Sequence, residues 1–107
     1  MASHPDFVDY VAEQLHQAGV IRSRKMFGEY GLYCDDVFFA VICDDQLFVK
    51  VTPQGAAAFP DLPKAPPYKG AKDYIWVEDV EDRERMTELT CITCEALRSE
   101  IPKNRRK

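Results

Sequence analysis

The sequence predicts an α+β domain: an antiparallel β-sheet of four to five strands in a meander, with an N-terminal helix and a long C-terminal helix packed on it. Three observations predict this fold. Apolar residues recur with helical spacing at both ends of the chain, β-branched and aromatic residues fill the middle, and short polar pairs divide that middle into runs.

Length and composition describe one ordinary globular domain. The chain has 107 residues, of which 46% are hydrophobic and 30% charged, so it suits a single core and is not a disordered chain. Its net charge is −4. The chain therefore lacks the excess of basic residues that supplies most of the affinity of a nucleic-acid-binding protein. We find no secretory signal and no membrane-length apolar run, and therefore expect a cytoplasmic protein with reduced cysteines.

The first helix is predicted over residues 5–18. Ser3 or His4 is placed to cap it, Pro5 suits its first turn, and Gly19 suits its exit. Its apolar residues gather on one face, which we expect to pack against the sheet. They are Phe7, Val8, Val11, Leu15 and Ala18.

Residues 23–51 read as strands separated by two hairpin turns, Asp35-Asp36 and Asp44-Asp45. The strand at residues 37–43 is apolar on both faces, so it should be central, with cover on both sides. Strict alternation places Val37, Phe39, Val41 and Cys43 on one face and Phe38, Ala40 and Ile42 on the other.

The second half of the chain is predicted to hold two helices and one strand. Residues 53–59 form a short helix capped by Thr52, residues 60–70 carry four prolines and form a stiff loop, and residues 73–77 form a strand. A long helix follows over residues 79–101, with an acidic first turn that suits the helix dipole. Its buried stripe is Met86, Leu89, Thr93, Ala96 and Leu97. The proline series has an alternative interpretation as a polyproline ligand for a partner.

Cys91 and Cys94 form a C-x-x-C pair, a spacing that elsewhere serves redox chemistry or zinc binding. Here the pair lies inside the last helix rather than at its start. Helical residues three apart keep their Cβ atoms about 5–6 Å apart, whereas a disulfide needs about 3.5–4.5 Å. Cys34 and Cys43 should lie about 20 Å apart along the sheet. At that distance they cannot bind one zinc ion together with the C-x-x-C pair. We interpret the cysteines as packing residues and expect no metal and no cofactor.

No arrangement of catalytic residues can be assigned from the sequence. The aspartate pairs flank opposite ends of one strand, so solvated turns explain them better than magnesium ligands do. His16 points away from the apolar stripe of its helix, and His4 lies close to the N-terminus. We therefore expect a protein that is not an enzyme.

Gly28 and Gly31 follow three basic residues, Arg22, Arg24 and Lys25. A phosphate-binding loop would need successive glycines followed by a helix, whereas Gly31 leads into another strand. We interpret both glycines as bend or bulge positions. Basic residues on an edge strand usually prevent aggregation; a weak anion or nucleic-acid contact is the alternative.

The segment MFGEYGLYCDDVFFAVICDDQLFVKV resembles the signature block of the N-terminal domain of the TfoX/Sxy family, regulators of competence genes in bacteria. The matching positions are Met26, Phe27, Gly28, Tyr30, Gly31, Tyr33, Phe39, Ala40, Asp45, Leu47, Phe48 and Lys50. The resemblance covers residues 7–97. It implies an α+β fold with an antiparallel sheet and a role in transcription of DNA-uptake genes, without catalytic residues to carry over. We expect one stand-alone domain, since the helical second domain of these regulators has no counterpart in this sequence.

The sequence thus supports three hypotheses. The first is a non-enzymatic regulatory module that contacts a protein partner, such as a transcription complex, or a second copy of itself. We expect no contact with a membrane. The second is a weak nucleic-acid-binding protein, and the third is a small redox or ligand-binding protein that uses Cys91 and Cys94. The nucleic-acid contacts of the second hypothesis would be Arg22, Arg24 and Lys25 together with a basic tail that we expect to fray, Lys103, Arg105, Arg106 and Lys107.

Overall fold

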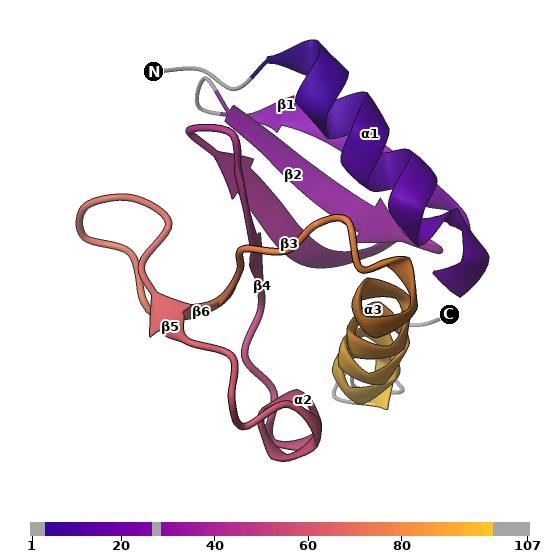
Figure 1. Ribbon diagram of the computed structural model, residues 1–107, viewed down its shortest axis with the longest axis vertical. Helices are drawn as coiled ribbons and strands as arrows, with labels where there is room; N and C mark the ends of the chain where they lie inside the picture. Colours follow the sequence, from indigo (N-terminus) through magenta and orange to yellow (C-terminus); the bar gives the residue numbers. More distant parts are fainter. Residues whose placement is uncertain (1–3, 27–28, 100–107) are drawn as a thin grey trace, which may run out of the picture.

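The computed structural model describes residues 4–26 and 29–99 (Figure 1). Six antiparallel strands form one sheet, in the order β1-β2-β3-β4-β6-β5. The elements in chain order are α1 (Pro5–Leu15), the 3₁₀ turn η1 (His16–Ala18), β1 (Ile21–Met26), β2 (Glu29–Cys34), β3 (Val37–Cys43), β4 (Gln46–Val49), α2 (Pro53–Ala58), β5 (Lys64–Ala65), β6 (Tyr74–Val77) and α3 (Arg83–Ser99).

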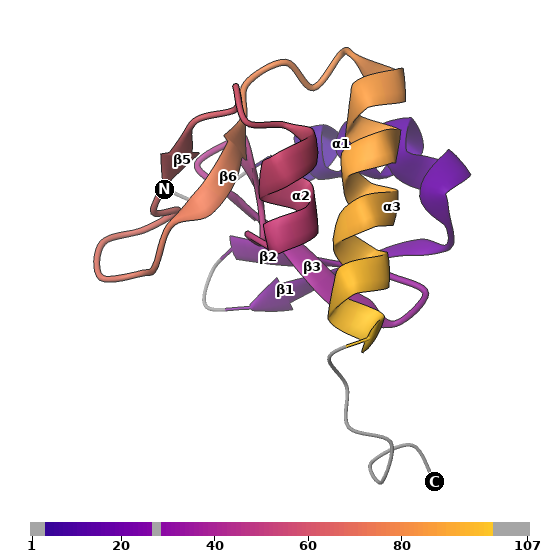
Figure 2. The ribbon, with the colours of Figure 1, turned by 90° about the horizontal axis from the view of Figure 1, so that it is seen from below.

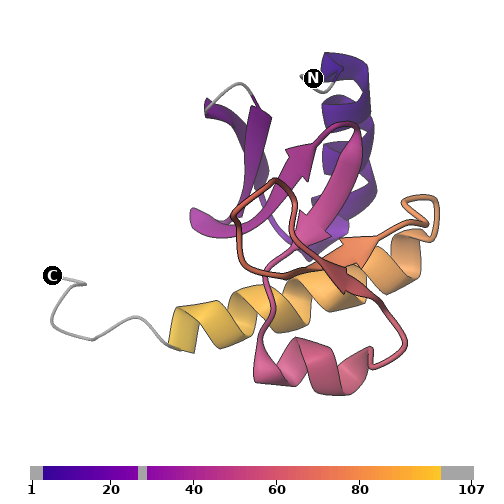
Figure 3. The same ribbon diagram turned by 90° about the vertical axis from the view of Figure 1, so that its left-hand side faces the viewer.

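The α+β fold predicted from the sequence is confirmed. In Figure 1 α1 lies at the upper right, alongside β1 and β2, α3 lies below it, and the segment between β5 and β6 projects to the left. α2 runs beside α3 (Figure 2), and α1 and α3 cross steeply (Figure 3). The sheet has six strands rather than four to five because Lys64 and Ala65, inside the proline-rich loop, pair with β6.

Both hairpin turns are two-residue aspartate turns, as predicted. Asp35, Asp36, Asp44 and Asp45 all have positive φ, at 50°, 70°, 54° and 56°, the backbone of a type I′ turn. Aspartate tolerates this region better than most residues with a Cβ atom. At the first turn the carboxylate of Asp35 also accepts a hydrogen bond from the backbone N–H of Val20 at 3.0 Å, which ties the turn to the end of η1.

A β-bulge interrupts the pairing of β2 with β3. Leu32 lies opposite Ala40, but Tyr33 lies opposite Phe38, so Phe39 is an extra residue in β3. The strict alternation predicted for residues 37–43 is therefore wrong. Phe39 lies in the core with Ala40 and Ile42, whereas Phe38 packs on the opposite face, with Val41 and Cys43.

The first helix begins at Pro5 as predicted, but its α-helical part ends at Leu15 rather than at residue 18, and its cap also differs from the prediction. His4 is the N-cap of α1 but makes no side-chain cap; its backbone N–H and its ring Nδ1 instead contact the carboxylate of Asp45, at 2.8 and 2.7 Å. This pairing raises the pKa of His4 and lowers that of Asp45. The other proposed cap, Ser3, lies outside the described residues.

The last helix begins at Arg83 rather than at residue 79. The carboxylate of Asp79 accepts a hydrogen bond from the backbone N–H of Glu81 at 3.1 Å, a local turn that competes with helix formation. Asp82 then caps the helix by accepting a hydrogen bond from the backbone N–H of Arg85 at 3.2 Å. The expected end of this helix, Ile101, lies outside the described residues.

The main core fills the space between the sheet and the helices. Val8, Val11 and Leu15 of α1 and Met86, Leu89 and Cys94 of α3 belong to it, as do residues of β2, β3, β4 and β6. Thr52 caps α2 as predicted: its hydroxyl accepts a hydrogen bond from the backbone N–H of Gly55 at 3.0 Å. Within residues 4–26 and 29–99, no helix is both long and apolar enough to cross a membrane.

Gly19 is required where the chain leaves η1. Its φ is +155°, and a Cβ atom there would lie 2.7 Å from Asp35 Oδ2 and 2.8 Å from Cys34 Sγ. Neither atom moves freely. Cys34 is buried, and the Asp35 carboxylate is held by the N–H of Val20 and lies 3.6 Å from Arg98.

We therefore predict that Gly19→Ala destabilises the protein more than Gly70→Ala does. Gly70 also has a positive φ, +90°, but nothing lies within 4 Å of its Cβ position, so it carries only the backbone cost of about 1–2 kcal/mol. Gly19→Ala adds overpacking of about 1–3 kcal/mol. Urea unfolding of both variants measures the difference, and equal free energies of unfolding would show that the contact at Gly19 is unimportant.

Candidate functional site

The two faces of the sheet differ in what covers them. One face packs against α1 and α3 and forms the main core. The other carries a second cluster, drawn entirely from strands: Val41, Cys43 and Phe48, with partly buried Phe38, Ala65, Tyr74 and Trp76 around them. We call this second side of the sheet the open face. Residues that pair across neighbouring strands share a face, so Arg22, Arg24 and Tyr33 also belong to it.

A row of cationic and aromatic side chains crosses the open face. Arg22 lies opposite Tyr33, and Tyr33 lies opposite Phe38. The rings of Tyr33 and Phe38 have centroids 5.3 Å apart and are tilted by 44°. Lys50 Nζ sits 4.7 Å from the centroid of the Phe38 ring, a cation–π contact. The row thus places aromatic surface next to positive charge.

A second row lies beside the first, toward the middle of the strands. Arg24 pairs with Gly31, and Gly31 pairs with Val41. Val41 then faces Phe48, and Phe48 faces Trp76. Gly31 contributes no side chain between Arg24 and Val41. The sequence predicted Gly31 at a bend or bulge, but it lies inside β2, just before the bulge that begins at Leu32.

The three basic residues singled out in the sequence do not form one cluster. Arg22 and Arg24 lie on the open face, whereas Lys25 lies opposite Tyr30, which packs on the main core. All three side chains are exposed on β1, the edge strand of the sheet. The other basic candidates, Lys103, Arg105, Arg106 and Lys107, lie outside the described residues.

The cysteines are arranged differently from the C-x-x-C hypothesis. Cys94 is buried and lies in the main core with Cys34, while the thiol of Cys34 points to the carbonyl oxygen of Ala18 at 3.7 Å. Burial raises the pKa of both thiols, which makes them poor nucleophiles. Cys91 is exposed. The sequence spacing gave no sign that Cys34 and Cys94 meet, since they are 60 positions apart (94 − 34).

Cys43 lies on the open face, away from the core that holds Cys34 and Cys94. A zinc ion held jointly by all four cysteines is therefore excluded by geometry. In the described ranges, no three side chains of histidine, cysteine, aspartate or glutamate are grouped so that they would hold a metal ion.

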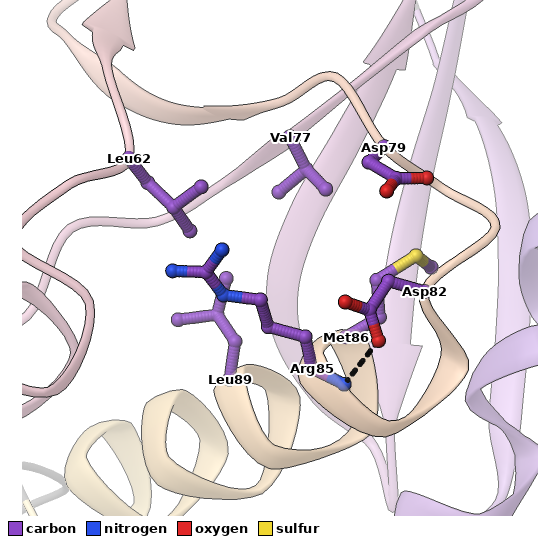
Figure 4. A pocket seen from close by; sticks show the side chains of 7 residues that line it. All are labelled: Leu62, Val77, Asp79, Asp82, Arg85, Met86 and Leu89. Carbon is purple, nitrogen blue, oxygen red and sulfur yellow. Dashed lines mark hydrogen bonds between the residues drawn. The ribbon is translucent and has the colours of Figure 1, made fainter.

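Two pockets in the described part of the chain are small. One of about 50 Å³ lies where the loop before β5, the end of β6 and the start of α3 meet (Figure 4). It is lined by Leu62, Val77, Asp79, Asp82, Arg85, Met86 and Leu89. Arg85 is engaged there: its guanidinium binds Asp61 at 2.6 Å and stacks 5.1 Å from the Phe59 ring centroid.

A second pocket of about 240 Å³ lies where α1 begins and β4 and β6 meet, between Phe7, Gln46 and Trp76. Binding sites for small molecules usually enclose about 300–1,000 Å³. Both of these pockets fall below that range.

Comparison with known proteins identifies the family. The model of the TfoX N-terminal domain matches residues 13–95. The chain belongs to the TfoX N-terminal domain family. It is also similar to a protein of Spirochaeta aurantia described as "Uncharacterized 12.7 kDa protein in trpE 5'region", with 35% identity over 105 residues, which cover 96% of this chain and 90% of that protein.

The family signature maps onto both faces of the β2–β3 hairpin. Tyr30 and Phe39 pack in or against the main core, and Gly31 and Tyr33 lie on the open face. Lys50 covers the Phe38 ring and donates its backbone N–H to the carbonyl of Phe39 at 2.8 Å. Phe27, Gly28 and the side chain of Met26 lie outside the described part of the chain. The signature of this TfoX N-terminal domain therefore surrounds the bulge that separates Phe38 from Phe39.

We predict that one thiol of the native protein reacts rapidly with Ellman's reagent and that the other three react far more slowly. Cys91 is exposed and Cys34, Cys43 and Cys94 are buried, and burial removes both access and thiolate character. Cys91→Ser should abolish the rapid phase, and denaturation should release all thiols. Formation of a Cys91–Cys94 disulfide under mild oxidation would instead support the redox hypothesis.

Proposed function

We propose that this TfoX N-terminal domain is a non-enzymatic binding module that contacts a protein partner through its open face, within an assembly that regulates transcription. One observation carries the proposal. Among residues 4–26 and 29–99 the helices cover one face of the sheet, and the opposite face combines half-buried aromatic residues with exposed arginines. Aromatic residues and arginine are enriched at the centres of protein interfaces and supply most of their binding energy.

The charge of the open face indicates the kind of partner. Arg22 and Arg24 lie on its border, and Lys50 lies over Phe38. An acidic surface on the partner would complement these cations, which speeds encounter and sets specificity. The regulatory role itself rests on family membership, since regulators of competence carry this type of domain.

We predict that Arg24→Glu abolishes partner recovery while Lys25→Glu preserves it. The two residues are neighbours on one exposed strand and the substitutions change net charge equally, but only Arg24 lies on the open face. Affinity capture from native extract with quantitative mass spectrometry measures recovery for the wild type and both variants. Equal loss in both variants, or no specific partner for the wild type, would contradict the proposal.

A second candidate function is weak binding of single-stranded nucleic acid. The observation that favours it is the row Arg22, Tyr33 and Phe38, because a cation beside aromatic rings resembles a platform for stacked bases. Lys25 lies on the other side of the strand and would not contribute to that row.

This candidate predicts binding of a labelled oligonucleotide that weakens steeply as salt rises, because each neutralised phosphate releases counterions. Titrations at low and moderate salt measure it, with Arg22→Glu expected to weaken binding and Lys25→Glu to have less effect. Absence of salt-sensitive binding by the wild type would remove this candidate.

A further inference from the structure

The two edges of the sheet differ in their capacity to accept another strand. β5 has only two residues, Lys64 and Ala65, and lies between Pro63 and Pro66. Proline lacks the N–H that a sheet needs, so this edge is short and blocked. The usable edge is β1 on the opposite side.

β1 is a long and regular edge. Its six residues pair with β2 without a break, from Ile21 opposite Cys34 to Met26 opposite Glu29, and in the described part of the chain no strand lies beyond it. Residues 22–25 are all exposed. The outer side of such a strand presents unpaired N–H and C=O groups, which serve as a template for an added strand.

A second copy of the chain fits this edge poorly. Two copies of β1 could pair antiparallel about a two-fold axis. With the axis at Ser23, Arg22 would face Arg24 of the other copy, and with the axis at Arg24, the two Arg24 residues would face each other. With the axis between Ser23 and Arg24, Arg22 would face Lys25. Like charges directly opposite each other destabilise a strand pair. The same three charges attract an acidic strand.

We infer that β1 binds an extended acidic segment of a partner protein, which adds to the sheet as a further strand. This inference rests on the proposed function and names the chemistry of the partner. Main-chain hydrogen bonds to β1 would hold the segment, and acidic side chains at alternate positions would lie beside Arg22 and Arg24 on the open face.

The binding of a synthetic peptide tests the inference directly. The probe is an octapeptide of alternating glutamate and threonine, and its matched control replaces glutamate with lysine. We expect the acidic peptide to bind and to slow hydrogen–deuterium exchange in residues 21–26. A peptide N-methylated at two adjacent central residues, which blocks both of its edges, should bind much more weakly.

Charge reversal in the protein supplies the second arm. Arg22→Glu or Arg24→Glu should weaken binding of the acidic peptide about tenfold, because a favourable cross-strand pair becomes a repulsive one, and should strengthen binding of the lysine peptide. The inference is overturned if both peptides bind equally, if N-methylation has no effect, or if protection appears elsewhere than in β1. The inference is also overturned if the acidic peptide does not bind while an oligonucleotide binds without protecting the amides of β1.

The outcomes separate this inference from the proposed function. Recovery of a partner that depends on Arg24 but leaves the β1 amides unprotected would support the binding module and refute strand addition. Protection of β1 by the acidic peptide, with no partner recovered from extract, would support strand addition and refute the module as proposed.

Discussion

The burial of Phe39 is the interaction on which the rest of the structure depends. Its side chain is fully buried in the main core, a position worth about 1.5–3 kcal/mol relative to solvent exposure. It reaches that core because the bulge opposite Leu32 and Tyr33 adds one residue to β3. The same bulge turns Phe38 to the opposite side, where it meets Tyr33 and Lys50. One local irregularity therefore builds both the core and the aromatic row of the open face.

Net charge is a poor guide to the surface at β1, because the charged residues of this strand, Arg22, Arg24 and Lys25, are all basic. The exposed acidic residues lie on other elements, such as Asp6 and Glu13 on α1 and the hairpin-turn residues Asp36 and Asp44. At physiological ionic strength charges are screened beyond about 8 Å. A partner at β1 therefore meets a positive strand, although the chain as a whole carries −4.

Local patterns predicted most of the fold. Periodicity marked the helices, and the Asp-Asp pairs marked both hairpins. The sequence did not reveal the bulge, because strict alternation is the default for a strand and only the pairing of Tyr33 with Phe38 breaks it. It also placed the start of the last helix too early, since the Asp79 turn competes with helical hydrogen bonds.

The candidate site was predictable only in part. The basic residues of the edge strand were recognised, but which of them share a face depends on register, and register separates Arg24 from Lys25. The contact between Cys34 and Cys94 joins a strand to a helix far along the chain. Such tertiary contacts leave no local signal, so thiol spacing drew attention to Cys91 instead.

Hydroxyl-radical footprinting of the free protein tests the central claim most directly, because it reports the solvent access of neighbouring side chains separately. The account predicts ready modification of Phe38 and Tyr33 on the open face and protection of Phe39. Modification of Phe39 to the same extent as Phe38 would contradict it, because the bulge would then not divide the two rings between core and surface.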